Sequence, residues 1–122
     1  MPKILLIDDD EVQLQLQRML LSSQGYTVHS TADGPQGILL YKTLRPDLVL
    51  LDIGLPSISG IEVLKQIRQI DEKAKIIVIT GYASVESAVL AIREGAWDYV
   101  RKPYDVNALL KKIESALSVV SK

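Results

Sequence analysis

The sequence predicts an α/β protein whose parallel sheet is doubly wound, with helices covering both faces. Two observations support this class. Three short segments are almost purely aliphatic, and segments with helical periodicity lie between them along the chain. Continuous apolar strands are expected where both faces of a sheet are buried, as in a parallel sheet between helices. Alternating strands and helices predict right-handed crossovers within one sheet.

Five segments are expected to form the strands. The three aliphatic segments are residues 4–7, 48–51 and 76–79, and none of them alternates with polar residues. Residues 26–30 and 97–101 are weaker candidates. Together they predict five strands, each followed by a helix.

Helical periodicity fills the intervals between these strands. Three apolar stripes at spacings of three, four and seven residues carry it: Val12, Leu16, Met19 and Leu20; Val85, Ala88, Val89 and Ile92; and Val106, Leu109, Leu110, Ile113, Leu117 and Val120. The expected second helix has the poorest pattern, and the Asp33-Gly34-Pro35 turn leads into it.

The helix ends carry capping signals. Asp10 is placed to cap the first helix, and Ser59 with Glu62 has the spacing of a capping box for the third. Gly25 and Gly95 stand where helices are expected to end. The fold prediction is therefore a flavodoxin-like (βα)5 domain over residues 1–122, with strand order 2-1-3-4-5.

Composition narrows the function classes. The chain has a net charge of −1, which gives no electrostatic case for binding nucleic acid. It has no cysteine, so disulfide scaffolds, thiol nucleophiles and thiolate metal sites are excluded. No apolar stretch approaches the roughly 20 residues that span a bilayer, and the N-terminus is unlike a signal peptide. We expect a cytoplasmic location and no membrane contact.

Polar residues follow the expected strands at the edge where such sheets bind ligands. Asp8, Asp9 and Asp10 follow the first strand, Asp52 follows the third, and Lys102 follows the fifth. Helix capping accounts for Asp10 but not for Asp8, Asp9 and Asp52 together. Strands one and three are neighbours in the predicted order, so Asp8, Asp9 and Asp52 are expected to crowd together.

Crowded carboxylates need a counter-charge. Two of them about 4 Å apart repel by roughly 4 kcal/mol at an effective dielectric of 20. Mg²⁺ prefers oxygen ligands and typically uses one or two carboxylates together with phosphate oxygens. Lys102 adds a mobile positive charge, and Thr80, at the end of the fourth strand, adds a hydroxyl. A carboxylate nucleophile beside a metal, a lysine and a hydroxyl is typical of a phosphoryl-transfer site.

These residues resemble the five-part signature of response regulator receiver domains. The signature consists of Asp8-Asp9, Asp52, Thr80 and Lys102-Pro103, and the resemblance covers the whole chain. The resemblance implies that Asp52 is the phosphoacceptor and that the metal ligands are Asp9, Asp52 and the Gly54 carbonyl, with Asp8 acting through water. It also implies a cis bond between Lys102 and Pro103.

The same resemblance implies a switch and its partners. Thr80 and Tyr99 would couple the phosphoryl group to the face formed by the fourth helix, fifth strand and fifth helix. That face would bind an output domain, a partner or a second copy of the chain. Residues 79–89 and 94–99 resemble receivers of sigma-54-dependent activators and some hybrid kinases. A histidine kinase or phosphotransfer protein would be the donor, because the single histidine, His29, is expected to be a surface residue.

Hydrolysis of the aspartyl phosphate by the domain itself is also expected. Gly54 and Tyr82 stand two residues after Asp52 and Thr80, where they would flank the attacking water. Tyr82 is expected to shield the phosphoryl group. Gly81 stands where the family more often has alanine, which is expected to loosen the following loop.

Three other readings stay open from the residues alone. A flavodoxin-like cofactor binder would need a Ser, Thr or Gly-rich loop after the first strand, which is acidic here. A dehalogenase-type phosphatase would need a second acid two residues after its nucleophile, where Gly54 stands. A degenerate receiver that serves only as a scaffold is disfavoured by the complete set of acids.

Overall fold

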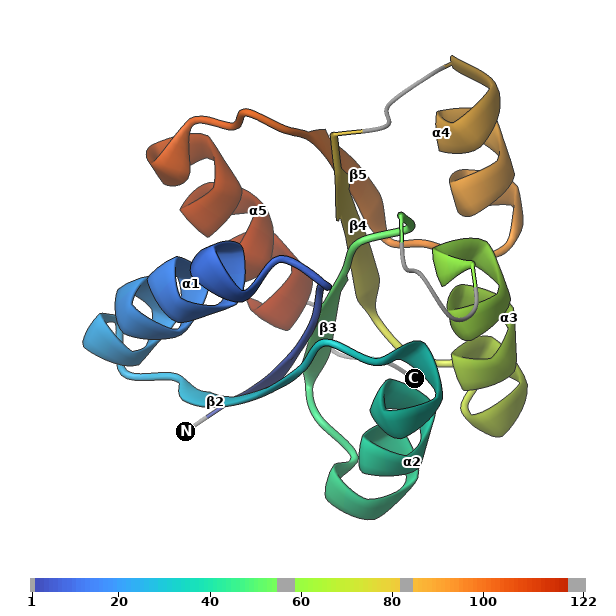
Figure 1. Ribbon diagram of the computed structural model, residues 1–122, viewed down its shortest axis with the longest axis horizontal. Helices are drawn as coiled ribbons and strands as arrows, with labels where there is room; N and C mark the ends of the chain where they lie inside the picture. The colour runs from blue at the N-terminus through green and yellow to red at the C-terminus, as the bar shows by residue number, and fades with distance from the viewer. Residues whose placement is uncertain (1, 55–58, 82–84, 119–122) are drawn as a thin grey trace.

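Five parallel strands form the sheet of the computed structural model, which describes residues 2–54, 59–81 and 85–118 (Figure 1). The strands are β1 (Lys3–Ile7), β2 (Thr27–Thr31), β3 (Leu48–Leu51), β4 (Ile76–Thr80) and β5 (Asp98–Arg101). Their order is β2-β1-β3-β4-β5, and every neighbouring pair is parallel. The predicted fold class and strand order are confirmed.

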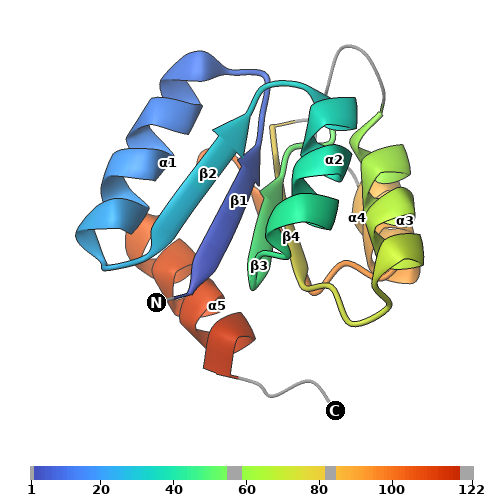
Figure 2. The same ribbon diagram turned by 90° about the horizontal axis from the view of Figure 1, so that it is seen from below.

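A helix follows each strand. The helices are α1 (Glu11–Ser23), α2 (Gly34–Leu44), α3 (Gly60–Ile70), α4 (Val85–Arg93) and α5 (Val106–Ser118). Helices α1 and α5 lie on one face of the sheet, and α2, α3 and α4 lie on the other (Figure 2). Among the described residues, no helix is both long enough and apolar enough to cross a membrane.

The aliphatic strands supply both cores, because successive side chains point to opposite faces of the sheet. Leu5, Ile7 and Val78 pack with α2, α3 and α4. Ile4 and Ile77 pack with α1 and α5. Every residue of β1, β3 and β4 apart from Lys3 is buried, which explains why those segments lack alternation.

The predicted caps are present. The Asp10 carboxylate accepts hydrogen bonds from the amides of Val12 and Gln13, at 3.0 and 3.2 Å. The Ser59 hydroxyl accepts from the Glu62 amide at the start of α3. Asp33, which was predicted only as part of a turn, also caps α2. Gly25 and Gly95 follow α1 and α4 with φ of 91° and 103°, a conformation that glycine adopts without a steric penalty.

The apolar stripe that predicts α1 is not the stripe that α1 buries. Val12, Leu16 and Met19 are 65%, 55% and 72% exposed. The helix buries Leu14, Gln17 and Leu21 instead. Likewise, Val89 and Ile92 of α4 are exposed while Ala91 is buried. The periodicity identified both helices correctly, but neighbouring helices decide which stripe is covered.

Candidate functional site

The register of the sheet brings two acids side by side. Ile7 on β1 pairs with Leu51 on β3, so the next residues, Asp8 and Asp52, leave the sheet together. The Asp52 amide donates to the Ile7 carbonyl at 2.8 Å, which continues the pairing by one residue. The first acid pair is therefore positioned by backbone geometry.

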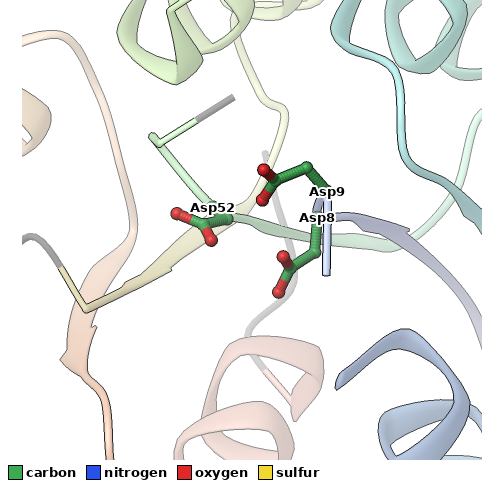
Figure 3. Close-up of side chains that lie close together, drawn as sticks. All are labelled: Asp8, Asp9 and Asp52. Atoms are coloured by element: carbon green, nitrogen blue, oxygen red, sulfur yellow. The ribbon is translucent and has the colours of Figure 1, made fainter. Parts of the chain in front are cut away.

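Three carboxylates meet at this edge. Asp8, Asp9 and Asp52 each offer an oxygen, and these oxygens lie within 4.8 Å of one another (Figure 3). Asp8 and Asp52 are buried, whereas Asp9 is exposed. The predicted crowding of the three acids is thus present, and an all-oxygen donor set of this kind suits a hard divalent cation.

Lys102 reaches into the cluster from the segment after β5. Its Nζ donates to Asp8 Oδ2 at 2.9 Å and to Asp52 Oδ2 at 3.2 Å. Its backbone amide donates to the Thr80 carbonyl at 3.0 Å, and its peptide bond to Pro103 is cis, as the resemblance implied. The ammonium therefore lies between the two buried carboxylates.

Each buried carboxylate is oriented by its own turn. Asp8 Oδ1 accepts from the Asp10 amide and Asp52 Oδ1 accepts from the Gly54 amide, both at 2.9 Å. In both residues the other oxygen takes the Lys102 hydrogen bond. Each of the two carboxylates is therefore held by hydrogen bonds to both of its oxygens.

The electrostatics of the pair follow from burial and proximity. Burial alone would lower the pKa of Lys102, but the hydrogen bonds and charges of Asp8 and Asp52 outweigh it, so that pKa is raised. Burial raises the pKa of Asp8, and the nearby Asp52 charge adds to this, against the Asp10 amide and Lys102. The raised pKa keeps the Lys102 side chain protonated beside the two buried acids.

The start of α3 lies against the backbone that carries Asp52. The Gly60 amide donates to the Ile53 carbonyl at 3.1 Å. A Cβ at Gly60 would lie 2.1 Å from Ile53 Cα and 2.7 Å from the Asp52 carbonyl oxygen. Only glycine allows α3 to begin this close to the site.

The two predicted switch residues lie on neighbouring strands. Thr80 is fully buried at the end of β4, at the same edge as the acids. Tyr99 on β5 is half-buried, and its hydroxyl lies 3.1 Å from the Ser87 hydroxyl of α4. Tyr82 lies outside the described residues. His29 is half-buried on the edge strand β2.

Two residues near the site were missed by the sequence reasoning. Gln17 is buried on α1 and donates to the Tyr104 hydroxyl, and Ser87 contacts Tyr99. The spacing of Leu14, Gln17 and Leu21 is itself a helical stripe, so it was a readable signal for Gln17. In the sequence, however, the stripe through Leu16 is more apolar and favours that face as the buried one. No comparable signal marks Ser87, because its contact depends on the packing of α4 against β5.

Comparison with known proteins decides the family. The family model described as the response regulator receiver domain matches residues 4–114. The chain belongs to this family. The receiver prediction is therefore confirmed.

Relatives of known sequence are longer than this receiver domain. It is 36% identical over 119 residues to the regulatory protein AtoC of Escherichia coli, covering 98% of this chain and 26% of AtoC. It is also 36% identical over 113 residues to the cell cycle response regulator CtrA of Brucella ovis, covering 93% of this chain and 49% of CtrA. The chain thus spans a half or less of the length of these curated relatives.

Solved receiver structures share the fold. A CheY-like receiver domain protein from Methanospirillum hungatei JF-1 matches with a TM-score of 0.93 and 34% identity, covering 96% of this chain and 94% of that one. The CheX-CheY-BeF3-Mg²⁺ complex from Borrelia burgdorferi matches with a TM-score of 0.90 and 27% identity, covering 96% and 90%.

Proposed function

We propose that this receiver domain accepts a phosphoryl group on Asp52 from the phosphohistidine of a partner kinase or phosphotransfer protein. A carboxylate oxygen of Asp52 would attack phosphorus, and the new P–O bond would form as the P–N bond to histidine breaks. The released imidazole nitrogen would take up a proton. The single observation that carries the proposal is the Lys102 ammonium between buried Asp8 and Asp52.

Asp52 has the properties of an anchored nucleophile. One oxygen is fixed by the Gly54 amide, and the other faces a mobile ammonium that a phosphoryl oxygen can displace. Phosphoryl transfer depends mostly on positioning and charge neutralisation, both of which this arrangement supplies. Gly54 offers no side-chain acid, which disfavours the phosphatase alternative.

The donor set fits Mg²⁺. We propose that Asp9, Asp52 and the Gly54 carbonyl hold the ion, with Asp8 acting through water. The ion, when bound, neutralises the charge that carboxylates and phosphoryl oxygens bring together. The Mg²⁺ and BeF3 named for the similar B. burgdorferi complex support this assignment.

Lys102 and Thr80 are proposed to hold the transferred group. Lys102 would leave the carboxylates for a phosphoryl oxygen, and the Thr80 hydroxyl would donate to another. Hydrolysis would follow when water attacks phosphorus, breaking the P–O bond to Asp52 and releasing phosphate. That Tyr82 shields the phosphoryl group from water stays a prediction.

We further propose that α4, β5 and α5 form the output face. Val89, Ile92 and Trp97 are exposed there, an arrangement of apolar side chains suited to binding another protein or a second copy. The Tyr99–Ser87 contact joins β5 to α4, so movement of Tyr99 would reach the exposed surface. The phosphoryl group can bias only states that it contacts differently.

The test is the intact mass after incubation with acetyl phosphate and Mg²⁺. Wild type should gain one phosphoryl group, and Asp52→Asn should gain none. Asp10→Asn is the matched control, because asparagine keeps the α1 cap and Asp10 lies outside the cluster. A comparable adduct on Asp52→Asn would reject Asp52 as the nucleophile.

A further inference from the structure

Gln17 is a buried amide in a position that otherwise suits an apolar residue. It is 3% exposed and lies between Leu14 and Leu21 on the stripe of α1 that faces the sheet. A buried amide is stable only when it has a hydrogen-bond partner. The Gln17 Nε2 donates to the Tyr104 hydroxyl at 3.2 Å.

Tyr104 belongs to the short segment that carries Lys102. This segment is tied to β4 at one end, where the Lys102 amide donates to the Thr80 carbonyl. At its other end, Tyr104 packs against the core shared by α1 and α5 and is tied to α1 by Gln17. One tie is made by the backbone of Lys102 itself and the other by Tyr104, two residues later, so both hold the backbone of the residue whose ammonium enters the acid cluster.

The second tie also joins the two walls of a groove. Leu16, Gln17 and Leu20 of α1 line one wall, and Pro103, Tyr104 and Val106 line the other, with Lys102 at the groove's edge toward the acids. The groove encloses about 560 Å³. Any change that separates α1 from the segment after β5 would therefore move the backbone that carries Lys102.

We propose that Gln17 is a positioning residue for Lys102, acting through its hydrogen bond to Tyr104. This inference rests on the proposed function, in which the Lys102 ammonium neutralises the transferred phosphoryl group. A lysine side chain is long and flexible, so the position of its backbone decides how often the ammonium meets its target. Small misplacements of such groups slow a reaction strongly.

The experiment uses Gln17→Leu and Tyr104→Phe, which keep shape and remove one partner each. The phosphorylation rate with acetyl phosphate at saturating Mg²⁺ should fall roughly tenfold in each variant. The Mg²⁺ dissociation constant, measured by calorimetry, should stay within about twofold of wild type because Lys102 is not a proposed metal ligand. A purely structural disturbance of the acid cluster would weaken Mg²⁺ binding as well.

The double variant separates positioning from stability. In Tyr104→Phe the buried Gln17 amide loses its hydrogen-bond partner. Replacing both partners by apolar groups removes that amide, so Gln17→Leu/Tyr104→Phe should be more thermally stable than Tyr104→Phe. Its phosphorylation rate should stay low, because the tie is still missing. Recovery of the rate together with stability would overturn the proposal, as would a wild-type rate in both single variants.

Tyr41→Phe is the matched control. It also removes a tyrosine hydroxyl bonded to a side chain, here Asp71, but in the opposite core. Its phosphorylation rate should equal that of wild type, and an equal slowing would overturn the proposal by showing that the rate follows stability. Absence of phosphorylation in wild type itself would instead count against the proposed function.

Discussion

Lys102 illustrates how much of the candidate site is determined by single residues at strand ends. Asp8, Asp9, Asp52 and Lys102 were all predicted because each follows a predicted strand, and parallel strands end at one edge. Their convergence follows directly from strand order and register. Gln17 was not predicted, because its partner lies 87 positions away and only the packed α1 brings it there.

The exposed acid of the cluster gives the first prediction. Asp9→Asn removes one proposed ligand charge while leaving the buried pair of Asp8 and Lys102 intact. Mg²⁺ affinity, measured by calorimetry, should fall at least about tenfold, since ligand removal commonly has a larger effect than loss of an outer partner. Far-UV circular dichroism should be unchanged. Wild-type Mg²⁺ affinity in this variant would remove Asp9 from the metal site.

Two glycines give a paired prediction in which the same substitution has opposite effects. Gly60→Ala would drive a Cβ into the backbone of Ile53 and Asp52, so stability should fall by about 1–3 kcal/mol or more. No described atom lies within 4 Å of a Cβ at Gly81. Gly81→Ala should therefore raise stability by about 0.4–1 kcal/mol through the unfolded state. Urea unfolding measures both, and a neutral Gly60→Ala would contradict the close approach of α3.

At the scale of elements, periodicity predicted which segments are helices but not which faces they bury. Helix α1 carries two stripes, and the more apolar one, through Leu16 and Met19, is exposed. Helix α4 buries the small Ala91 and exposes Val89 and Ile92. Burial depends on neighbours distant in the sequence, so a local pattern cannot choose between two stripes.

The link between α2 and α3 gives a prediction about acid stability. Burial raises the pKa of Asp71, but the Lys73 amide, the Tyr41 hydroxyl, Arg45 and Arg68 together lower it below 3.8. A lowered pKa in the folded state contributes stability above the ordinary pKa, and that contribution is lost as the pH falls through the lowered value. Asp71→Asn should be less stable than wild type at neutral pH, and the difference should shrink below pH 3.8.

Urea unfolding of both proteins at about pH 7 and about pH 3 measures this difference. Glu72→Gln, an exposed neighbour, is the control and should follow wild type at both values. A difference between Asp71→Asn and wild type that persists unchanged in acid would contradict the ionic role of Asp71.

At the scale of the whole molecule, the sheet separates two cores and places the acids at one edge. Thr80 and Tyr99 lie on adjacent strands β4 and β5, and the Tyr99 hydroxyl lies 3.1 Å from the Ser87 hydroxyl of α4. The continuous apolar strands made this architecture predictable. The coupling of Thr80 and Tyr99 to the face that includes α4 was implied only by family resemblance. The Ser87 contact was not predicted, because a contact between hydroxyls leaves no periodic signal.

The proposed coupling between the acid edge and the face formed by α4, β5 and α5 predicts a spatial pattern of amide exchange. Addition of beryllofluoride and Mg²⁺, which mimic the phosphoryl group, should change exchange rates in α4 and β5 as well as at the acid edge. Amides of α2 should change little and serve as the internal reference. Changes confined to the acid edge would contradict the proposed output face.

Asp52 alone is proposed to receive the phosphoryl group, and trapping of the aspartyl phosphate with borohydride identifies the residue that carries it. Borohydride reduces an aspartyl phosphate to homoserine, which peptide mass spectrometry locates in the sequence. After reaction with acetyl phosphate and Mg²⁺, homoserine is expected at position 52, and aspartate should be retained at Asp8 and Asp9. Homoserine at Asp8 or Asp9, or at none of the three acids despite a phosphoryl adduct on the intact protein, would contradict it.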